Sequence, residues 1–246
     1  MAHRKLSIPM TKPLRIPWSK PTLIVGCIST QAGLSLLKLQ RTETDLIEVR
    51  IDMLLQAKTP LTVITRVLRQ RKHPVLLTLR TVDEGGVYSW KASERMDLFK
   101  KLIPLADAID VELHNAEPLR GVLRLARTQG RGVILSAHSL RRKITLGRGQ
   151  RWLEQFSHFR ADIYKMATLC RNREDLKVLI RLVMDHPKKR LAVMGTGPMS
   201  GISRMVLPAL GSRLVYGYLD EPTAPNQPSV QVLRDLLEIA GGTLPK

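Results

Sequence analysis

The chain has 246 residues, of which 43% are hydrophobic and 4% aromatic, and its formal net charge is +19. This length suits one α/β barrel or two small domains, and two cysteines without metal-ligand spacing, Cys27 and Cys170, exclude a disulfide scaffold and favour a reducing cytoplasm. The sequence has no apolar stretch of transmembrane length, and its basic start lacks the apolar run of a signal peptide, so we expect a cytoplasmic protein.

In chain order, the sequence alternates short apolar runs with segments long enough for a helix. The predicted strands are residues 22–28, 46–52, 75–80, 108–113, 132–138, 162–167, 191–195 and 214–219. Predicted helices between them include residues 61–71, 93–103, 118–129 and 173–185. This alternation predicts a parallel sheet, and eight units in about 220 residues match a closed (β/α)8 TIM barrel. An open doubly wound sheet is the alternative, but no GxGxxG fingerprint follows the first strand.

We expect a basic N-terminal arm or short hairpin over residues 1–20 and one barrel domain over residues 21–246, since no linker-like stretch divides the chain. Two loops that follow predicted strands stand out. Residues 81–90 contain the pair Gly85–Gly86, and residues 220–229 contain three prolines. Loops after barrel strands lie at the carboxyl end, where active sites of this fold form.

Polar side chains repeat on one face of five consecutive predicted strands. In chain order they are Glu48, Arg50 and Asp52, then Thr78 and Arg80, then Asp110 and Glu112, then Ser136 and His138, and then Lys165. Aliphatic residues such as Ile47 and Val49 occupy the opposite face, which must contact the helices, so the polar set must face the barrel interior. Isolated buried ions are costly, so this set either forms a neutralising network or binds a charged, polar substrate.

Lys165 is the only lysine in the predicted strands, and His138 ends the strand before it. Burial disfavours a charged amine, and a neutral amine attacks ketones to form an iminium that acts as an electron sink. A histidine beside that iminium can take or give a proton near neutral pH. The pair suggests aldol-type or elimination chemistry on a keto substrate, with a salt-bridged lysine and a structural histidine as the alternative. Arginines among the carboxylates argue against a metal site, and no cofactor is expected.

Several short motifs follow one another in a defined order and spacing. They are Glu48-Val49-Arg50-Ile51-Asp52, Thr78-Leu79-Arg80, Glu84-Gly85-Gly86, Ser136-Ala137-His138, Tyr164-Lys165-Met166, Met194-Gly195, Ser203-Arg204 and Ala224-Pro225-Asn226-Gln227. Each motif alone is weak, but the ordered set resembles type I 3-dehydroquinate dehydratase, the Schiff-base dehydratase of the shikimate pathway, over residues 22–240.

The resemblance implies conversion of 3-dehydroquinate to 3-dehydroshikimate and water in aromatic amino-acid biosynthesis. Lys165 would form the iminium with the C3 ketone, and His138, oriented by Glu84, would take a proton from C2 and help the hydroxyl leave. The implied substrate contacts are Glu48, Arg50, Arg80, Arg204, Thr223 and Gln227. Arg204 would pair with the substrate carboxylate, while Thr223 and Gln227 would close as a lid. Family members are often dimers, so the resemblance also allows a homodimer.

Five positions depart from the family pattern. Thr223 stands where serine is usual and Asn226 where glycine is usual, Ser139-Leu140 replaces a common Asp-Phe, and Cys27 stands where small polar residues are common. Asparagine tolerates left-handed backbone better than most residues, so the turn at Asn226 can persist. None of the departures removes a group that performs chemistry, so they bear on affinity and rate.

The sequence leaves two alternative functions. Another Schiff-base barrel lyase or aldolase is disfavoured by Arg204 and by the motif at residues 224–227. A nucleic-acid-binding protein, or a barrel without activity, is the second. The basic clusters at residues 69–72, 141–143 and 188–190 lack the interleaved aromatics of a single-strand platform, so we expect neither a nucleic-acid nor a membrane partner.

Overall fold

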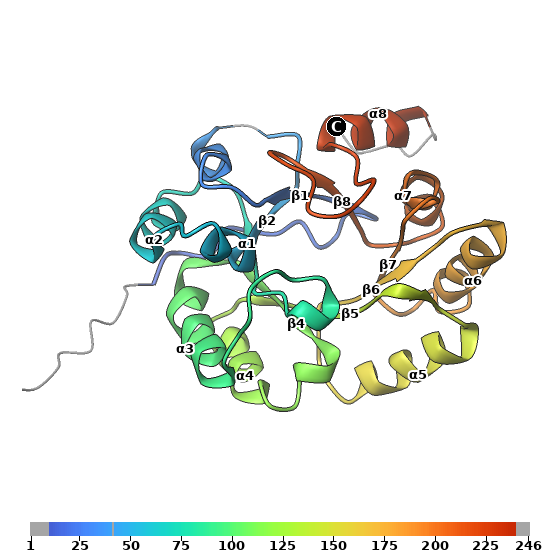
Figure 1. Cartoon of the computed structure of the whole chain (residues 1–246), viewed down its shortest axis with the longest axis horizontal. Helices are drawn as coiled ribbons and strands as arrows, with labels where there is room; N and C mark the ends of the chain where they lie inside the picture. Colours follow the sequence, from blue (N-terminus) through green and yellow to red (C-terminus); the bar gives the residue numbers. More distant parts are fainter. Residues whose placement is uncertain (1–9, 41, 240–246) are drawn as a thin grey trace, which may run out of the picture.

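Parallel strands and surrounding helices form a barrel in the computed structural model, which describes residues 10–40 and 42–239 (Figure 1). The strands are β1 (Leu23–Ile28), β2 (Leu46–Arg50), β3 (Val75–Thr78), β4 (Ala108–Glu112), β5 (Gly132–Lys143), β6 (Ile163–Leu169), β7 (Leu191–Thr196) and β8 (Leu214–Tyr218). Each strand from β1 to β6 pairs in parallel with the next, and β8 pairs with β1. The predicted (β/α)8 barrel is confirmed, and every predicted strand overlaps an observed one.

Helices cover the outside of the strands (Figure 1). The α-helices are α1 (Ile51–Gln56), α2 (Leu61–Arg69), α3 (Ala92–Leu102), α4 (Arg120–Thr128), α5 (Leu146–Ser157), α6 (Arg173–Met184), α7 (Ser200–Ala209) and α8 (Val230–Ile239). The 3₁₀ helices are η1 (Gly33–Lys38), η2 (Val82–Glu84), η3 (Ile103–Leu105) and η4 (Leu113–Asn115). None of these described helices is both long and apolar enough to cross a bilayer.

Two connections differ from the prediction of one α-helix per segment. Between β1 and β2 the described residues form the 3₁₀ helix η1 and no α-helix, whereas the segment between β2 and β3 forms both α1 and α2. In η1, Leu34 and Leu37 are both buried. Residues three apart share one face of a 3₁₀ helix, which has three residues per turn, so this short segment buries both leucines without a full α-helix.

Along the strands from β2 to β6, the side chains inside the barrel change from apolar to polar or charged. On β2, for example, Leu46 belongs to the apolar cluster inside the barrel, and Glu48 follows two residues later on the same face. The outward residues Ile47 and Val49 belong to the larger cluster between strands and helices. The face assignment made from alternation is therefore confirmed, and the buried charges gather toward the carboxyl ends of the strands.

Residues 10–20, the described part of the predicted arm, lie against the amino-terminal end of the barrel. The Leu14 amide donates to Asp107 at 2.6 Å, and the Trp18 carbonyl accepts from Arg190 and Arg213 at 2.9 and 2.7 Å. Ile16 is buried in the inner apolar cluster. No strand forms within residues 10–20, and residues 1–9 lie outside the described residues. The arm therefore shields the apolar layer from water at this end.

Side chains complete the barrel between β7 and β8, which share no strand ladder. The Ser212 hydroxyl accepts from the Val193 amide at 2.9 Å and donates to the Val193 carbonyl at 3.0 Å. Arg204 spans the same gap, donating to the carbonyls of Tyr216 and Gly195, each at 3.0 Å. The position of Arg204 is therefore set by the backbone of both strands.

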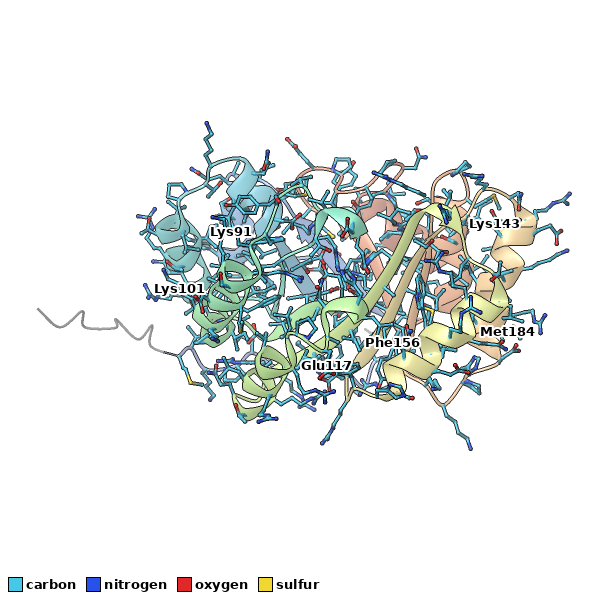
Figure 2. All side chains as sticks on the ribbon, turned by 60° about the horizontal axis from the view of Figure 1, so that its bottom comes forward. Lys91, Lys101, Glu117, Lys143, Phe156 and Met184 are labelled. Atoms are coloured by element: carbon cyan, nitrogen blue, oxygen red, sulfur yellow. The ribbon has the colours of Figure 1, made fainter. Side chains whose placement is uncertain are left out.

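β5 is longer than predicted, ending at Lys143 rather than at residue 138 (Figure 2). Its pairing with β6 shifts register between Ser139 and Lys143. The longer β5 therefore includes a lysine, Lys143, which lies outside the predicted strand. Lys143 is exposed beyond the barrel, however, so Lys165 is still the lysine that the described strands place inside it.

Candidate active site

A pocket at the carboxyl ends of the strands brings all the predicted site residues together. Its lining includes Lys165, His138, Glu84, Glu48, Arg50, Arg80, Arg204, Thr223 and Gln227. They come from β2, β5, β6, α7, the segment after β3 and the loop after β8. The geometry follows from the fold, because parallel barrel strands all end at one face.

Lys165 lies on β6 and is 4% exposed. Its Nζ donates to Asp110 Oδ2 at 3.0 Å, lies 3.9 Å from Glu48 Oε1 and stands 4.1 Å from the centroid of the Tyr216 ring. Burial alone would raise the pKa of Asp110, but Arg80 and Lys165 outweigh it and hold that pKa well below its usual value. The amine therefore has two ionised carboxylates as neighbours.

Arg80 connects these carboxylates to the neighbouring strands. It lies 2.9 Å from Asp110 and donates at 2.9 Å to Ser136 Oγ, which in turn donates to Asp110 at 2.6 Å. Glu48 accepts from Thr78 Oγ1 at 2.7 Å. Burial raises the pKa of Glu48, yet Lys165 and Arg50 hold it below the usual value. Most of the polar face thus forms the neutralising network that the sequence allowed as one outcome.

Arg50 has a separate partner. Its guanidinium makes a two-pronged contact with Asp52, at 2.9 and 2.7 Å. Asp52 was expected at the end of a strand, but β2 ends at Arg50 and Asp52 lies in the first turn of α1. The contact orients Arg50 at the pocket wall, because a bidentate pair fixes the plane of a guanidinium.

His138 is held by Glu84 from the loop after β3. Its Nδ1 lies 2.6 Å from Glu84 Oε2. The loop turns back through Gly85, whose φ of 89° is left-handed, and through Gly86, where a Cβ would lie 2.2 Å from the Arg80 carbonyl oxygen. The two glycines therefore let Glu84 approach the end of β5.

The protonation states of this pair suit a base. Burial lowers the pKa of His138, and Arg80 lowers it further, against the opposing pull of Glu84. Burial would raise the pKa of Glu84, but hydrogen bonds from His114 and His138 lower it to about 2. Near neutral pH, Glu84 is ionised and His138 is neutral. With Nδ1–H donated to Glu84, the Nε2 lone pair of His138 is left to accept a proton.

Arg204 is the exception among the buried cations of the pocket. It is 3% exposed and donates to carbonyl oxygens and to Ser200 Oγ, and no carboxylate among the described residues forms an ion pair with it. Burial lowers its pKa to about 10, so it is still a cation at neutral pH. A buried cation without a counter-charge favours binding of an anion.

The loop after β8 lies over the pocket and is tied to it at two points. Gln227 Oε1 accepts from the backbone amide and the hydroxyl of Thr223 at 2.7 and 2.9 Å, and Gln227 Nε2 lies 3.5 Å from Cys27 Sγ. Asn226 has φ 57°, so asparagine does occupy left-handed backbone here. Its carbonyl accepts from Ser200 Oγ at 3.1 Å. The departures at Thr223, Asn226 and Cys27 therefore leave the loop ordered.

Two residues that contact Lys165 were not among the predicted site residues. Asp110, the nearest carboxylate to Lys165, was recognised on the polar face but was not chosen as a site residue, although its parity with Lys165 was a signal. Tyr216 lines the pocket beneath Lys165. An inward aromatic on the last strand could have been found by the same alternation. His114, which contacts Glu84, had no signal in the sequence.

A lysine, a histidine–carboxylate pair and an arginine with no carboxylate partner among the described residues lie together at the carboxyl ends of parallel strands, an arrangement typical of a (β/α)8-barrel enzyme. A sequence model described as type I 3-dehydroquinase matches residues 24–243. The chain therefore belongs to the type I 3-dehydroquinase family, as its motifs predicted, and is a carbon–oxygen hydro-lyase.

Individual relatives agree with this family. The 3-dehydroquinate dehydratase of Methanosarcina barkeri is 31% identical over 212 residues, which cover 82% of this chain and 88% of that protein. Type I 3-dehydroquinate dehydratase from Clostridium difficile, solved with covalently modified comenic acid, has TM-score 0.78 and 26% identity over 89% of this chain and 91% of that one. The Enterococcus faecalis structure has TM-score 0.76 and 25% identity over 89% and 93%.

Proposed function

We propose that this protein dehydrates 3-dehydroquinate to 3-dehydroshikimate in the shikimate pathway, through a Schiff base on Lys165 with His138 as general base and acid. The observation that carries the proposal is the placement of one buried lysine amine in the same pocket as a neutral, carboxylate-bound histidine. Family membership supports the substrate, and the unpaired Arg204 supports a substrate that carries a carboxylate.

The first step is attack of the Lys165 amine on the ketone carbon. Only the neutral amine can attack, and its hydrogen bond to Asp110 Oδ2 at 3.0 Å holds the nitrogen in place. The carbonyl oxygen leaves as water after taking up two protons, and the nitrogen becomes an iminium. That cation takes the place of the ammonium, so the nearby carboxylates and the Tyr216 ring 4.1 Å away stabilise it too.

The second step is elimination. The iminium acidifies the adjacent C2, and His138 Nε2 accepts a proton from it while the electron pair moves toward nitrogen to form an enamine. The enamine then expels the hydroxyl group two carbons from the iminium carbon, with the proton on His138 completing a water molecule. Hydrolysis of the conjugated iminium releases 3-dehydroshikimate and restores the Lys165 amine.

The remaining pocket residues orient the substrate. Arg204 pairs with the carboxylate, since its guanidinium is charged and has no carboxylate partner among the described residues. Glu48, Arg50 and Arg80 bind the ring hydroxyls, and Thr223 with Gln227 covers the substrate from the β8 loop. Closing that loop excludes water and favours the covalent intermediate over hydrolysis before elimination.

Borohydride trapping tests the proposal. Reduction of the protein in the presence of 3-dehydroquinate should add the ligand covalently to Lys165, identified by mass spectrometry of peptides. Lys165→Ala should fold and show no rise in the ultraviolet absorbance of the enone product. Lys143→Ala, which removes the exposed lysine at the end of β5, is the matched control and should keep wild-type turnover. Labelling at another lysine, or an active Lys165→Ala variant, would disprove the mechanism.

A further inference from the structure

Glu84 holds a second histidine that the proposed reaction does not use. Its Oε2 contacts His138 Nδ1 at 2.6 Å, and its Oε1 contacts His114 Nδ1 at 2.9 Å. His114 lies in η4, directly after the strand that carries Asp110. One carboxylate therefore stands between two imidazoles, one at the candidate active site and one outside it.

The two histidines have different surroundings. The side chain of His138 is 8% exposed, whereas that of His114 is 48% exposed. His114 lines a separate pocket together with Glu117 and with Trp152 of α5. Glu84 lines both pockets. His114 can therefore exchange protons with solvent, while the buried His138 faces the reacting groups.

Asn115 determines the role of each His114 nitrogen. Its amide Nδ2 lies 2.9 Å from His114 Nε2 and 3.4 Å from Glu112 Oε2. An amide nitrogen only donates, and the nearby carboxylate excludes the flipped amide, so Nε2 of neutral His114 is an acceptor. Its Nδ1 then carries the proton and donates it to Glu84. The contact is a directed hydrogen bond to the carboxylate that orients His138.

We propose that His114 is a positioning residue for the reaction, which holds one oxygen of Glu84 and thereby sets the pH at which His138 accepts a proton. This inference rests on the proposed function for its catalytic meaning. A carboxylate stabilises a protonated imidazole, and a second donor on the same carboxylate weakens that effect. His114 therefore favours the neutral, basic form of His138.

Charged groups from several elements surround the two rings. His138 is faced by Arg80 and Lys165, which lower its pKa after burial, and it also lies near Asp110. The hydrogen bond to Glu84 raises the pKa of His114, with Glu112 adding to the rise and Arg95 of α3 opposing it. As the pH rises, His138 thus loses its proton before His114 does. His138 is then free to act as base while His114 Nδ1 still contacts Oε1 of Glu84.

The test measures the titration of His138 directly. In wild type and in His114→Ala, the imidazole signals are followed by NMR against pH, and the His138 signal is assigned by its loss in His138→Gln. The pKa of His138 should rise by at least about half a unit in His114→Ala. The acidic limb of kcat/KM for 3-dehydroquinate should move to higher pH by the same amount.

His158→Ala is the matched control, because His158 lines the same outer pocket and has no hydrogen bond to Glu84 within the described parts of the chain. It should leave both the His138 pKa and the pH profile unchanged. A shift below about 0.2 units in His114→Ala, or an equal shift in His158→Ala, would overturn the inference. If wild type failed to dehydrate 3-dehydroquinate, the proposed function would fall, while the NMR titration would still decide the role of His114.

Discussion

At the scale of single residues, the role of each buried arginine in the site depends on whether it forms an ion pair with a carboxylate of the protein. Arg50 is paired with Asp52 and Arg80 with Asp110, and each pair is compensated without a substrate. Arg204 is charged and buried, and its partners are backbone carbonyls and a hydroxyl. The difference explains why one arginine suits recognition of an anion while the others order the network.

Replacing Arg204 tests that distinction. Arg204→Gln should lower kcat/KM for 3-dehydroquinate by about 100-fold or more, because a charge-assisted contact to the carboxylate is lost. Arg204→Lys keeps the charge but not the two-pronged geometry. Its kcat/KM should therefore lie between those of Arg204→Gln and wild type. Both are measured by initial rates, with thermal unfolding as a check, since Arg204 also bridges β7 and β8. Equal kcat/KM in Arg204→Gln and wild type would contradict the assignment.

Glu84 links the site to stability through pH. Its pKa is about 2 in the folded protein, below the value of 4.5 for an unperturbed glutamate. Because the folded pKa is depressed, the stabilisation is complete above about pH 4.5 and is lost as the pH falls toward 2. Glu84→Gln should therefore lower the free energy of unfolding at pH 7 by about 1–3 kcal/mol, with a smaller difference at pH 3. Urea unfolding at both pH values measures this, and a larger difference at pH 3 would refute it.

At the scale of elements, loops carry the functional detail and strands supply its position. The loop after β8 is anchored at its start, where Asp220 accepts the backbone amides of Ser29 and Thr30 at 3.0 and 2.8 Å. It then turns through Asn226 and places Gln227 next to Cys27. The loop after β3 likewise turns back over the barrel and places Glu84 next to His138 of β5. Both loops were recognised from glycine and proline content, but their contacts depend on strands distant in sequence.

Thr223 gives a test of the β8 loop. Thr223→Ala should raise KM several-fold, because the hydroxyl bond to Gln227 Oε1 is lost while the backbone amide bond persists, a change of about 1 kcal/mol. Thr223→Ser keeps the hydroxyl and should stay near wild type. Steady-state kinetics with 3-dehydroquinate compare the two variants. If serine were as damaging as alanine, the methyl group rather than the hydroxyl would be what matters.

At the scale of the whole molecule, the barrel separates stability from activity between its two ends. The carboxyl end carries the pocket, and the amino end is covered by residues 10–20. Trp18 packs there against Gly132, where a Cβ would lie 2.8 Å from the indole, and its ring lies 5.7 Å from the Arg190 guanidinium. The arm is thus part of the folded barrel. A homodimer and a cytoplasmic location stay predictions from the sequence.

Trp18→Ala should reveal this separation. The free energy of unfolding should fall by about 1–3 kcal/mol, since the indole packs against the apolar layer, while kcat at 25 °C stays within about two-fold of wild type. Met184→Ala, which truncates a side chain 56% exposed at the end of α6, is the control and should change neither quantity. Denaturant unfolding and initial rates measure both. Loss of kcat in folded Trp18→Ala would show coupling between the ends.

The sequence by itself determined the fold class, the inward face of the strands and the polar strand residues that line the pocket. These properties are local, because alternation along a strand assigns each side chain to a face, and parallel strands bring those faces together. Only the tertiary structure decided which charges pair, since partners such as Lys165 and Asp110 lie on different strands. It also decided that Arg204 lacks a carboxylate among the described residues and that Glu84 is shared by two histidines. Those outcomes depend on distances between segments far apart in the chain, which no local pattern encodes.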